Sequence, residues 1–289
     1  MKRYCLLLAA ALLLPLSGCK KEMPKNFAAM PDVLSDDELN IAENEPSYKC
    51  IESHYMNGKL EEKKERLYDE HDHMISSDEF NVDTGETIPA MHGKHVNEYD
   101  VDGNWVKGIW YGPDEKTVDR VFINTYDENG NRTSIAVYYN YDGQPKKYLY
   151  YEMKYDGHGN ETEWIKAKAD NGIHGVCKYS YEFDDKGNIT KKTEDDSSSK
   201  HETEEYTYTY DDDGNMLTEN RRRYSKKETL FESSRKCDYD SRGNLIREES
   251  SFSDGRADKV ISYEYDAHNR KIRETDGYSE TLYEYETVK

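Results

Sequence analysis

Aliphatic residues are scarce in this chain. Beyond position 18, Leu, Ile, Val and Phe together number 39 of 271 residues, about 14%. With a formal net charge of −20, so few core-forming residues are ordinarily typical of a disordered chain. The 26 tyrosines change that expectation, because each ring can bury roughly 150 to 250 Å² while its hydroxyl stays in water or finds a partner. The composition therefore predicts a fold whose core is built from tyrosine.

The sequence also lacks the residue patterns of an active site. It has no G-x-S-x-G nucleophile elbow and no cysteine beside a suitably spaced histidine. Paired carboxylates occur throughout so acidic a chain, and their presence therefore identifies nothing. His71 and His73 flank a turn residue, and His92 and His95 lie near each other, but no Cys or further His follows at zinc-ligand spacing. We interpret the turn histidines as solvated, and we expect no enzyme, no cofactor and no metal.

Basic clusters are equally rare. The run from Arg221 to Arg223 is set among glutamates, and nothing else in the sequence is concentrated enough to neutralise phosphates. Binding to nucleic acid is therefore disfavoured. The acidic balance is explained by the need to keep an exposed protein in solution.

Cysteines past Cys19 are odd in number, at Cys50, Cys177 and Cys237. Cys177 and Cys237 are predicted to lie about four strands apart, or ~19 Å at the usual spacing of strands. That separation is beyond the reach of a disulfide unless the sheet curls sharply. We interpret these cysteines as small core residues.

One motif occurs along most of the chain: an aromatic residue, Asp, two variable residues and then usually Gly-Asn. The leading aromatic residues are separated by 31, 27, 29, 28, 27, 29 and 26 positions, and a period near 28 indicates a repeat architecture. The copies are YDEHDH from Tyr68, YDVDGN from Tyr99, YDENGN from Tyr126, YDGHGN from Tyr155, FDDKGN from Phe183, YDDDGN from Tyr210, YDSRGN from Tyr239 and YDAHNR from Tyr265.

The constant residues of this motif are those that a hairpin turn needs. Asp accepts hydrogen bonds from backbone N–H groups two residues on, and Gly supplies the positive φ that closes a type I turn with a bulge. Asp72 and Asn269 replace that Gly, and Asp and Asn are the other residues that best tolerate positive φ. Runs that alternate Tyr with Thr or charged residues precede the turns and predict half-buried strands.

Eight repeats of two strands give roughly sixteen antiparallel strands, and open sheets beyond ~10 strands tend to curl or split. We therefore predict an all-β fold, an elongated antiparallel meander or β-spiral of about eight β-hairpin repeats. The Tyr face is expected to line the inside of the curl, and the Thr, Glu and Lys face is expected to meet water.

Two turns, DVDGN at Asp100 and DDDGN at Asp211, look like the start of an EF-hand loop. That loop needs a bidentate Glu at its twelfth position, where this chain has Tyr111 and Arg222. An EF-hand is excluded. Weak cation binding to the acidic turns stays as an alternative to plain turns.

The N-terminus has the features of a secretory signal. Lys2 and Arg3 precede an apolar run that is too short to span a bilayer as a helix. The run ends in Leu-Ser-Gly-Cys19, which resembles the lipobox of bacterial lipoproteins, in which the Cys becomes the lipidated first residue. The resemblance implies a signal peptide at 1–18, a membrane anchor of acyl chains such as palmitate on Cys19, a lipidated tether at 19–47 and a repeat domain at 48–289. Because Lys20 is not the Asp that retains some lipoproteins in the inner membrane, an outer-membrane location is favoured.

With its YD-x-x-GN units, the stretch from about 68 to 285 resembles YD-repeat, or RHS-type, bacterial surface proteins. The resemblance implies an exported repeat scaffold. In large relatives such repeats form a shell around a toxin, but this repeat is longer than the usual unit and eight copies would hardly enclose a cargo. We therefore do not expect a toxin.

Together these features predict a lipid-anchored protein of the bacterial cell envelope that binds glycan or protein through a Tyr- and Trp-rich β surface. The candidate binding residues are Trp105, Trp110 and Trp164, whose rings are suited to stack on sugars or peptides; filling the core is the other role open to them. The alternative function is a structural or assembly scaffold of the envelope. A groove that exposes several Tyr and Trp side chains favours binding, whereas a filled interior favours the scaffold.

Overall fold

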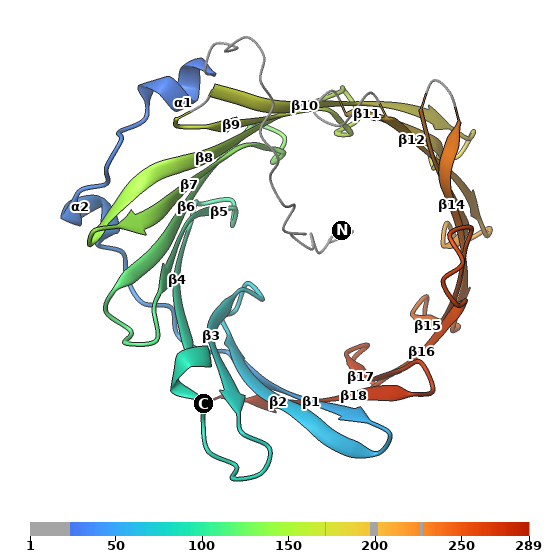
Figure 1. Cartoon of the computed structure of the whole chain (residues 1–289), viewed down its shortest axis with the longest axis horizontal. Helices are drawn as coiled ribbons and strands as arrows, with labels where there is room; N and C mark the ends of the chain where they lie inside the picture. The colour runs from blue at the N-terminus through green and yellow to red at the C-terminus, as the bar shows by residue number, and fades with distance from the viewer. Residues whose placement is uncertain (1–23, 171, 197–201, 226–227, 289) are drawn as a thin grey trace.

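The computed structural model describes residues 24–170, 172–196, 202–225 and 228–288. The predicted signal peptide and the predicted lipid anchor Cys19 lie outside the described residues. Within them the fold is almost entirely antiparallel β-sheet, with two short helices and one 3-10 turn (Figure 1). No helix in this part of the chain is long and apolar enough to cross a bilayer.

The helices are α1 (Lys25–Ala29) and α2 (Asp36–Leu39), and the 3-10 turn is η1 (Pro89–Met91). The strands are β1 (Tyr48–Met56), β2 (Lys59–Tyr68), β3 (Met74–Phe80), β4 (Gly93–Tyr99), β5 (Trp105–Tyr111), β6 (Val118–Tyr126), β7 (Arg132–Tyr141), β8 (Gln144–Tyr155), β9 (Glu161–Lys168), β10 (Gly172–Phe183), β11 (Ile189–Asp196), β12 (Glu202–Tyr210), β13 (Met216–Tyr224), β14 (Thr229–Tyr239), β15 (Leu245–Phe252), β16 (Lys259–Tyr265), β17 (Lys271–Thr275) and β18 (Ser279–Thr287).

The sheet closes on itself. Each strand pairs with the next along the chain, and β18 pairs with β1 in a register that runs from Tyr48 opposite Thr287 to Met56 opposite Ser279. The all-β antiparallel meander is confirmed, but the elongated or spiral form is wrong, because the eighteen described strands form a closed barrel (Figure 1). Closure satisfies the backbone groups that an open sheet would leave unpaired on its two edge strands.

The YD turns have the predicted geometry, as the turn at Asp240 shows. The Asp240 carboxylate accepts from the N–H groups of Arg242 and Asn244, both at 2.9 Å, and from the Asn244 side chain, also at 2.9 Å. Gly243 adopts a φ of 80° and donates to the Asp240 carbonyl at 3.0 Å. Where Gly is replaced, Asp72 and Asn269 still adopt positive φ, at 63° and 61°. Each of these residues is therefore accounted for by turn geometry.

In most repeats the tyrosine that leads the motif ties its hairpin to the preceding one. The Tyr210 hydroxyl, for example, donates to the Ile189 carbonyl at 2.8 Å. In the repeat led by Phe183, which has no hydroxyl, Tyr181 two residues earlier makes the equivalent bond to the Glu161 carbonyl at 2.6 Å. The same bond is formed by Tyr126, Tyr155, Tyr239, Tyr265 and Tyr285 with the carbonyls of Trp105, Arg132, Met216, Leu245 and Lys271. We call this series the tyrosine ladder.

The short helices identify the outer face of the barrel, because α1 and α2 lie outside the ring of strands (Figure 1). Phe27 and Leu34 of this segment pack with Ile109, Val121 and Tyr138 in the main cluster of buried residues. Side chains alternate between the two faces of a strand and paired residues share a face. The residues that come directly before and after these outward residues along each strand therefore point to the inside of the barrel. The tyrosines of the ladder share that inner face, as the sequence predicts for the Tyr face.

Residues 24–47, the described part of the predicted tether, lie against the outer wall. The Lys147 side chain of β8 is 4% exposed and donates to the carbonyls of Phe27 and Met30, both at 2.9 Å, and its ammonium lies 3.0 Å from Asp32. The Phe27 ring stacks on Tyr150 with centroids 4.9 Å apart. At β5–β9 the outer face is therefore covered by chain, whereas the sequence predicted a wetted outer face throughout. A capping box between Ser35 and Glu38 begins α2.

The junction between β3 and β4 is the shortest in the barrel, with Ser76 and Ser77 paired to Lys94 and Gly93. Beside it the Asn44 side chain accepts from the Asn97 N–H at 2.6 Å and donates to the Asn97 carbonyl at 2.9 Å. At this position β3 offers β4 no backbone partner. The Asn44 side-chain amide takes the place of that partner.

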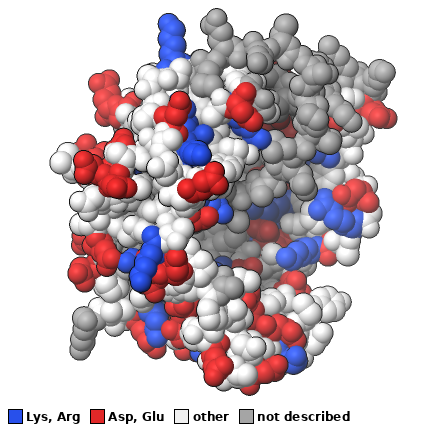
Figure 2. Space-filling view, turned by 60° about the vertical axis from the view of Figure 1, so that its left-hand side comes forward, with Lys and Arg blue, Asp and Glu red and all other residues white. Residues whose placement is uncertain are grey.

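Away from that covered region the outer face is ionic. Lys49 lies 3.5 Å from Glu65 and 3.0 Å from Glu286, and Lys191 lies 2.7 Å from Glu205. On the face that carries α1 and α2, too, acidic and basic side chains are interspersed (Figure 2). Charged pairs near the middle of strands indicate that water contacts this surface.

Asp240→Asn tests the role of the turn carboxylates through pH. Hydrogen bonds from Asn244, with further bonds from backbone N–H groups, lower the pKa of Asp240 from 3.8 to about 2. A lowered pKa contributes stability above the unfolded value, and this contribution is lost as pH falls through the folded value. The difference in melting temperature between the wild-type protein and the variant should be constant above about pH 5, shrink from pH 3.8 to about 2, and level off below. A difference that does not change with pH would contradict this role.

Candidate functional site

The three candidate tryptophans lie on the inner face of the barrel. Trp105 and Trp110 of β5 flank the Phe122 ring of β6, with centroids 5.9 and 4.8 Å from it. Trp110 also packs on His95 of β4 at 4.7 Å. Arg120 and Phe122 lie on either side of the outward Val121 along β6 and therefore point inward. Each pairs with a residue of β5 that also points inward. The fold therefore brings two of the three predicted residues together through a phenylalanine that sequence reasoning did not single out.

The position of the Trp105 ring depends on Gly108. A Cβ at this position would collide with the Trp105 ring, so the ring lies flat across the backbone of its own strand. The Trp105 carbonyl accepts from the Asn124 side chain at 2.9 Å and from the Tyr126 hydroxyl at 3.0 Å. A glycine inside a strand is a known signal of close approach, and the sequence offered that signal here.

Aromatic and basic side chains continue along the inner face beyond Trp110. The Arg120 guanidinium lies 5.6 Å from the Trp110 ring centroid and 5.2 Å from that of Tyr139 on β7. Tyr139 meets Tyr148 of β8 edge to face at 5.0 Å, and the Lys168 ammonium lies 5.4 Å from the Tyr148 ring. Cations held over aromatic faces in this way are attracted to the ring electrons.

Trp164 of β9 belongs to the far end of this region. Its ring lies 6.0 Å from Tyr151, edge to face, and the Lys166 ammonium lies 5.6 Å from the same Tyr151 ring. We call the inward rings of β5–β9 the inner aromatic arc; they are Trp105, Trp110, Phe122, Tyr139, Tyr148, Tyr151 and Trp164. All seven are half-buried, so each presents part of its ring to the interior.

The opposite part of the inner face, β11–β15, is ionic. Arg221 forms a bidentate pair with Glu204 at 2.8 and 2.9 Å, and Arg235 lies 3.3 Å from both Glu219 and Glu248. Burial acts to raise the pKa of Glu204, but hydrogen bonds, chiefly from Arg221, hold it below its ordinary value. Charges that are already paired within the wall offer little to a ligand, so the aromatic arc is the better candidate site.

His73 differs from its predicted role as a solvated turn residue. Its Nδ1 lies 2.6 Å from the Tyr99 hydroxyl, which donates to the Asp69 carboxylate at 2.5 Å, and Asp69 is buried. The His73 ring also packs 5.8 Å from Trp105. The weak first repeat thus uses Asp and His partners where later repeats use the tyrosine ladder. Spacing alone did not reveal this network, because its members lie in two different repeats.

The cysteines past Cys19 are free and buried, as expected of small core residues. Burial raises the pKa of the Cys177 thiol to about 12, and burial also raises the pKa of Cys50 and Cys237. A thiol must ionise to act as a nucleophile, so burial makes these three groups less reactive.

The acidic turns are occupied by their own hydrogen bonds. Both carboxylate oxygens of Asp211 accept within the turn, from Asp213 and Asn215 at distances of 2.8 to 3.0 Å, and Asp100 does the same. Among the described residues, no group of three or more His, Cys, Asp or Glu is placed to hold a metal ion.

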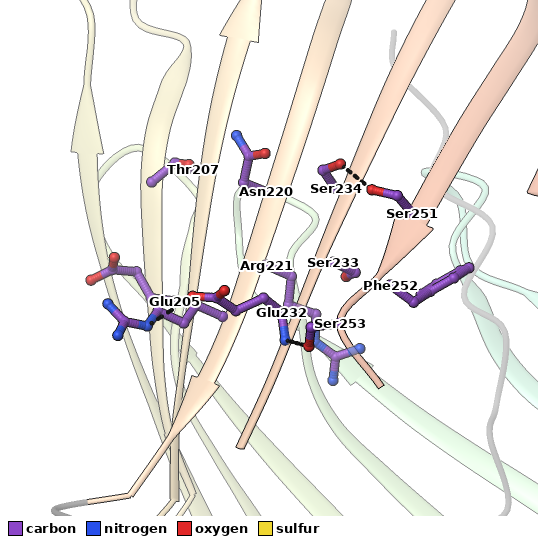
Figure 3. A pocket seen from close by; sticks show the side chains of 11 residues that line it. Glu205, Thr207, Asn220, Arg221, Glu232, Ser233, Ser234, Ser251, Phe252 and Ser253 are labelled. Atoms are coloured by element: carbon purple, nitrogen blue, oxygen red, sulfur yellow. Dashed lines mark hydrogen bonds and ion pairs between the residues drawn. The ribbon is translucent and has the colours of Figure 1, made fainter. Parts of the chain in front are cut away.

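A hollow lies on the outer face of β12–β15. This polar groove has a volume of about 550 Å³ and is lined by hydroxyl, amide and charged side chains, with Phe252 at one end (Figure 3). Ser234 and Ser251 are hydrogen-bonded at 2.7 Å, and Arg222 lies 3.3 Å from Glu232. Tryptophan is absent from its lining.

Comparisons with known proteins show no match to a family model and none to a curated protein. Among solved structures, the chain is similar to a porin-like protein from Bacteroides uniformis, with 9% identity and a TM-score of 0.43, over 86% of this chain and 98% of that one. It is also similar to TcdB2-TccC3-TEV (10% identity, TM-score 0.28) and to TcdB2-TccC3 without its hypervariable C-terminal region (12%, 0.31). The latter matches cover 77% of this chain but only 17% and 15% of those chains.

Gly108→Ala tests the arrangement of the arc. The added methyl group should displace the Trp105 ring, lower stability by about 1–3 kcal/mol as overpacking does, and change the tryptophan emission. Gly157→Ala is the matched control, because nothing lies within 4 Å of its Cβ position and its φ is not positive. Urea unfolding with fluorescence measures both. Equal stabilities for the two variants would show that Trp105 does not lie over Gly108.

Proposed function

We propose that this protein is a lipid-anchored binding protein of the bacterial cell envelope, and that the inner aromatic arc binds the ligand, a glycan or a peptide segment of an envelope protein. Binding is non-catalytic: the arc supplies ring faces for stacking and basic groups for orientation.

The placement of the arc on a concave face carries this proposal. Barrels of about sixteen to eighteen strands are too wide for their inner side chains to meet across the middle. The seven rings are half-buried and therefore keep free surface on that side. Tryptophan and tyrosine rings that stay partly open on a concave wall favour ligand binding over a filled scaffold core.

Two other functions have less support. A barrel that spans a membrane presents an apolar band about 25 Å tall to lipid, whereas pairs such as Lys191 with Glu205 and Arg222 with Glu232 lie on the outer face here. A scaffold that docks by its sheet edges would need an unpaired edge strand, and the pairing of β1 with β18 removes both edges.

The envelope location is proposed from the sequence. The lipobox-like Leu-Ser-Gly-Cys19 supports a lipid anchor, and the YD-x-x-GN units support kinship with RHS-type surface proteins. Several acyl chains would hold the protein stably at a membrane, whereas one chain gives marginal binding. Lys20 favours the outer membrane.

Trp110→Ala tests the binding site. Loss of the ring that touches Phe122, His95 and Arg120 should weaken binding to a glycan array or an envelope pull-down by about tenfold or more, since stacked interface tryptophans are often dominant. Leu217→Ala, an exposed side chain outside the arc, is the control and should bind normally. Unchanged binding by the tryptophan variant, or failure of the wild-type protein to bind in both assays, would contradict the proposal.

Cys19→Ser tests the anchor. Without the thiol no acyl chain can be attached, so the variant should leave the membrane fraction and appear in the soluble envelope fraction. Cell fractionation with metabolic fatty-acid labelling measures this, and Cys50→Ser, which changes a buried thiol, is the control that should stay labelled and membrane-bound. A Cys19→Ser protein that still sediments with membranes would rule out the anchor.

A further inference from the structure

Among the described residues, two lysines beside the inner aromatic arc have no carboxylate partner. Lys166 and Lys168 lie over the rings of Tyr151 and Tyr148, and within the described residues neither forms an ion pair. Lys168 is buried, with 8% of its surface exposed. On the other wall, by contrast, Arg221 and Arg235 are each paired with glutamates. A buried cation without a carboxylate is costly unless another negative group approaches it.

The surroundings of these two lysines are positive as well. Arg120, between Trp110 and Tyr139, is partly compensated by Asp119 at 2.9 Å. Burial, with help from the charges of Lys168 and Lys166, lowers the pKa of His174, although Asp170 acts in the opposite direction. Asp170 is the acidic group in these surroundings. In a chain with 60 acidic and 40 basic residues, a stretch of wall with this many basic groups is unusual.

We propose that the inner aromatic arc binds a short anionic saccharide, with the sugar rings stacked on the tryptophans and the acidic group held by Lys166 and Lys168. This deepens the proposed function and rests on it. The aromatic rings supply flat apolar faces, which suit a pyranose ring, and the lysines supply donors for charge-assisted hydrogen bonds to a carboxylate.

Net charge limits the length of this ligand. At −20 the protein as a whole repels a long polyanion, and that repulsion acts over a range of about 10 Å at ordinary ionic strength. A saccharide with one or two acidic groups meets the local positive wall without bringing a large charge near the acidic rest of the barrel. Nucleic acid does not fit this requirement.

The test uses the full chain as it is expressed and follows its own tryptophan fluorescence, since all three tryptophans belong to the arc. The probes are a galacturonic acid disaccharide, its neutral galactose counterpart and tetraglutamate. We expect the acidic disaccharide to bind about tenfold or more tightly than the neutral one, and this advantage should fall as salt is added.

Lys166→Met and Lys168→Met should each remove most of that advantage, while Lys178→Met, a 69% exposed lysine that pairs with outward Glu163, should keep it. The salt titration of the wild-type protein supports the charge argument even where a lysine variant does not fold.

Equal affinity for both disaccharides, lost in Trp110→Ala, would overturn the anionic preference and leave the proposed function standing. Tighter binding of tetraglutamate would overturn the saccharide class. Failure of all three probes would overturn this inference, whereas the proposed function is decided separately by the glycan array and pull-down.

Discussion

Pairing of the first strand with the last is the constraint on which the rest of this structure depends. All other pairs join strands that follow one another along the described chain, but β1 and β18 bring residues 48–56 against 279–287. That pairing gives the sheet an inside and an outside. It places the tyrosine ladder and the aromatic arc on a concave wall, and it removes the two edges at which a sheet of this size would otherwise meet other molecules.

Tyrosine makes such a barrel possible in a chain so poor in aliphatic residues. Each ladder tyrosine buries its ring against the inner face and uses its hydroxyl to hold the preceding hairpin, so one residue supplies apolar contact and register together. In the repeat led by Phe183, Tyr181 supplies the hydroxyl that bonds to the preceding hairpin. The hydroxyl contact is therefore kept when the motif changes. Because Asp and Gly are occupied by turn geometry, the proposed binding is assigned to residues that vary between repeats, such as the tryptophans of β5 and β9.

Local features were predictable and global ones were not. Turn chemistry alone predicted positive φ at Asp72 and Asn269, and alternation predicted which face the tyrosines share. Closure was missed, because a periodic sequence has the same local pattern in an open spiral and in a ring. The docking of residues 24–47 was also missed, since nothing in the spacing of Phe27 or Lys147 indicates that they meet. Trp105 and Trp110 were identified as candidates, but their contact through Phe122 depends on the register of β5 and β6.

Closure is tested most directly by a disulfide across the β1–β18 pair. Ser53 and Leu282 are directly opposite each other, and both point outward because His54 and Thr281 bond on the inner face. The double variant Ser53→Cys and Leu282→Cys should form an intramolecular disulfide on mild oxidation, which is detected as faster migration without reductant. The control pair Ser53→Cys and Ser262→Cys, with Ser262 on the distant strand β16, should stay reduced. Failure of the first pair to cross-link, or cross-linking only between molecules, would show that the sheet is open.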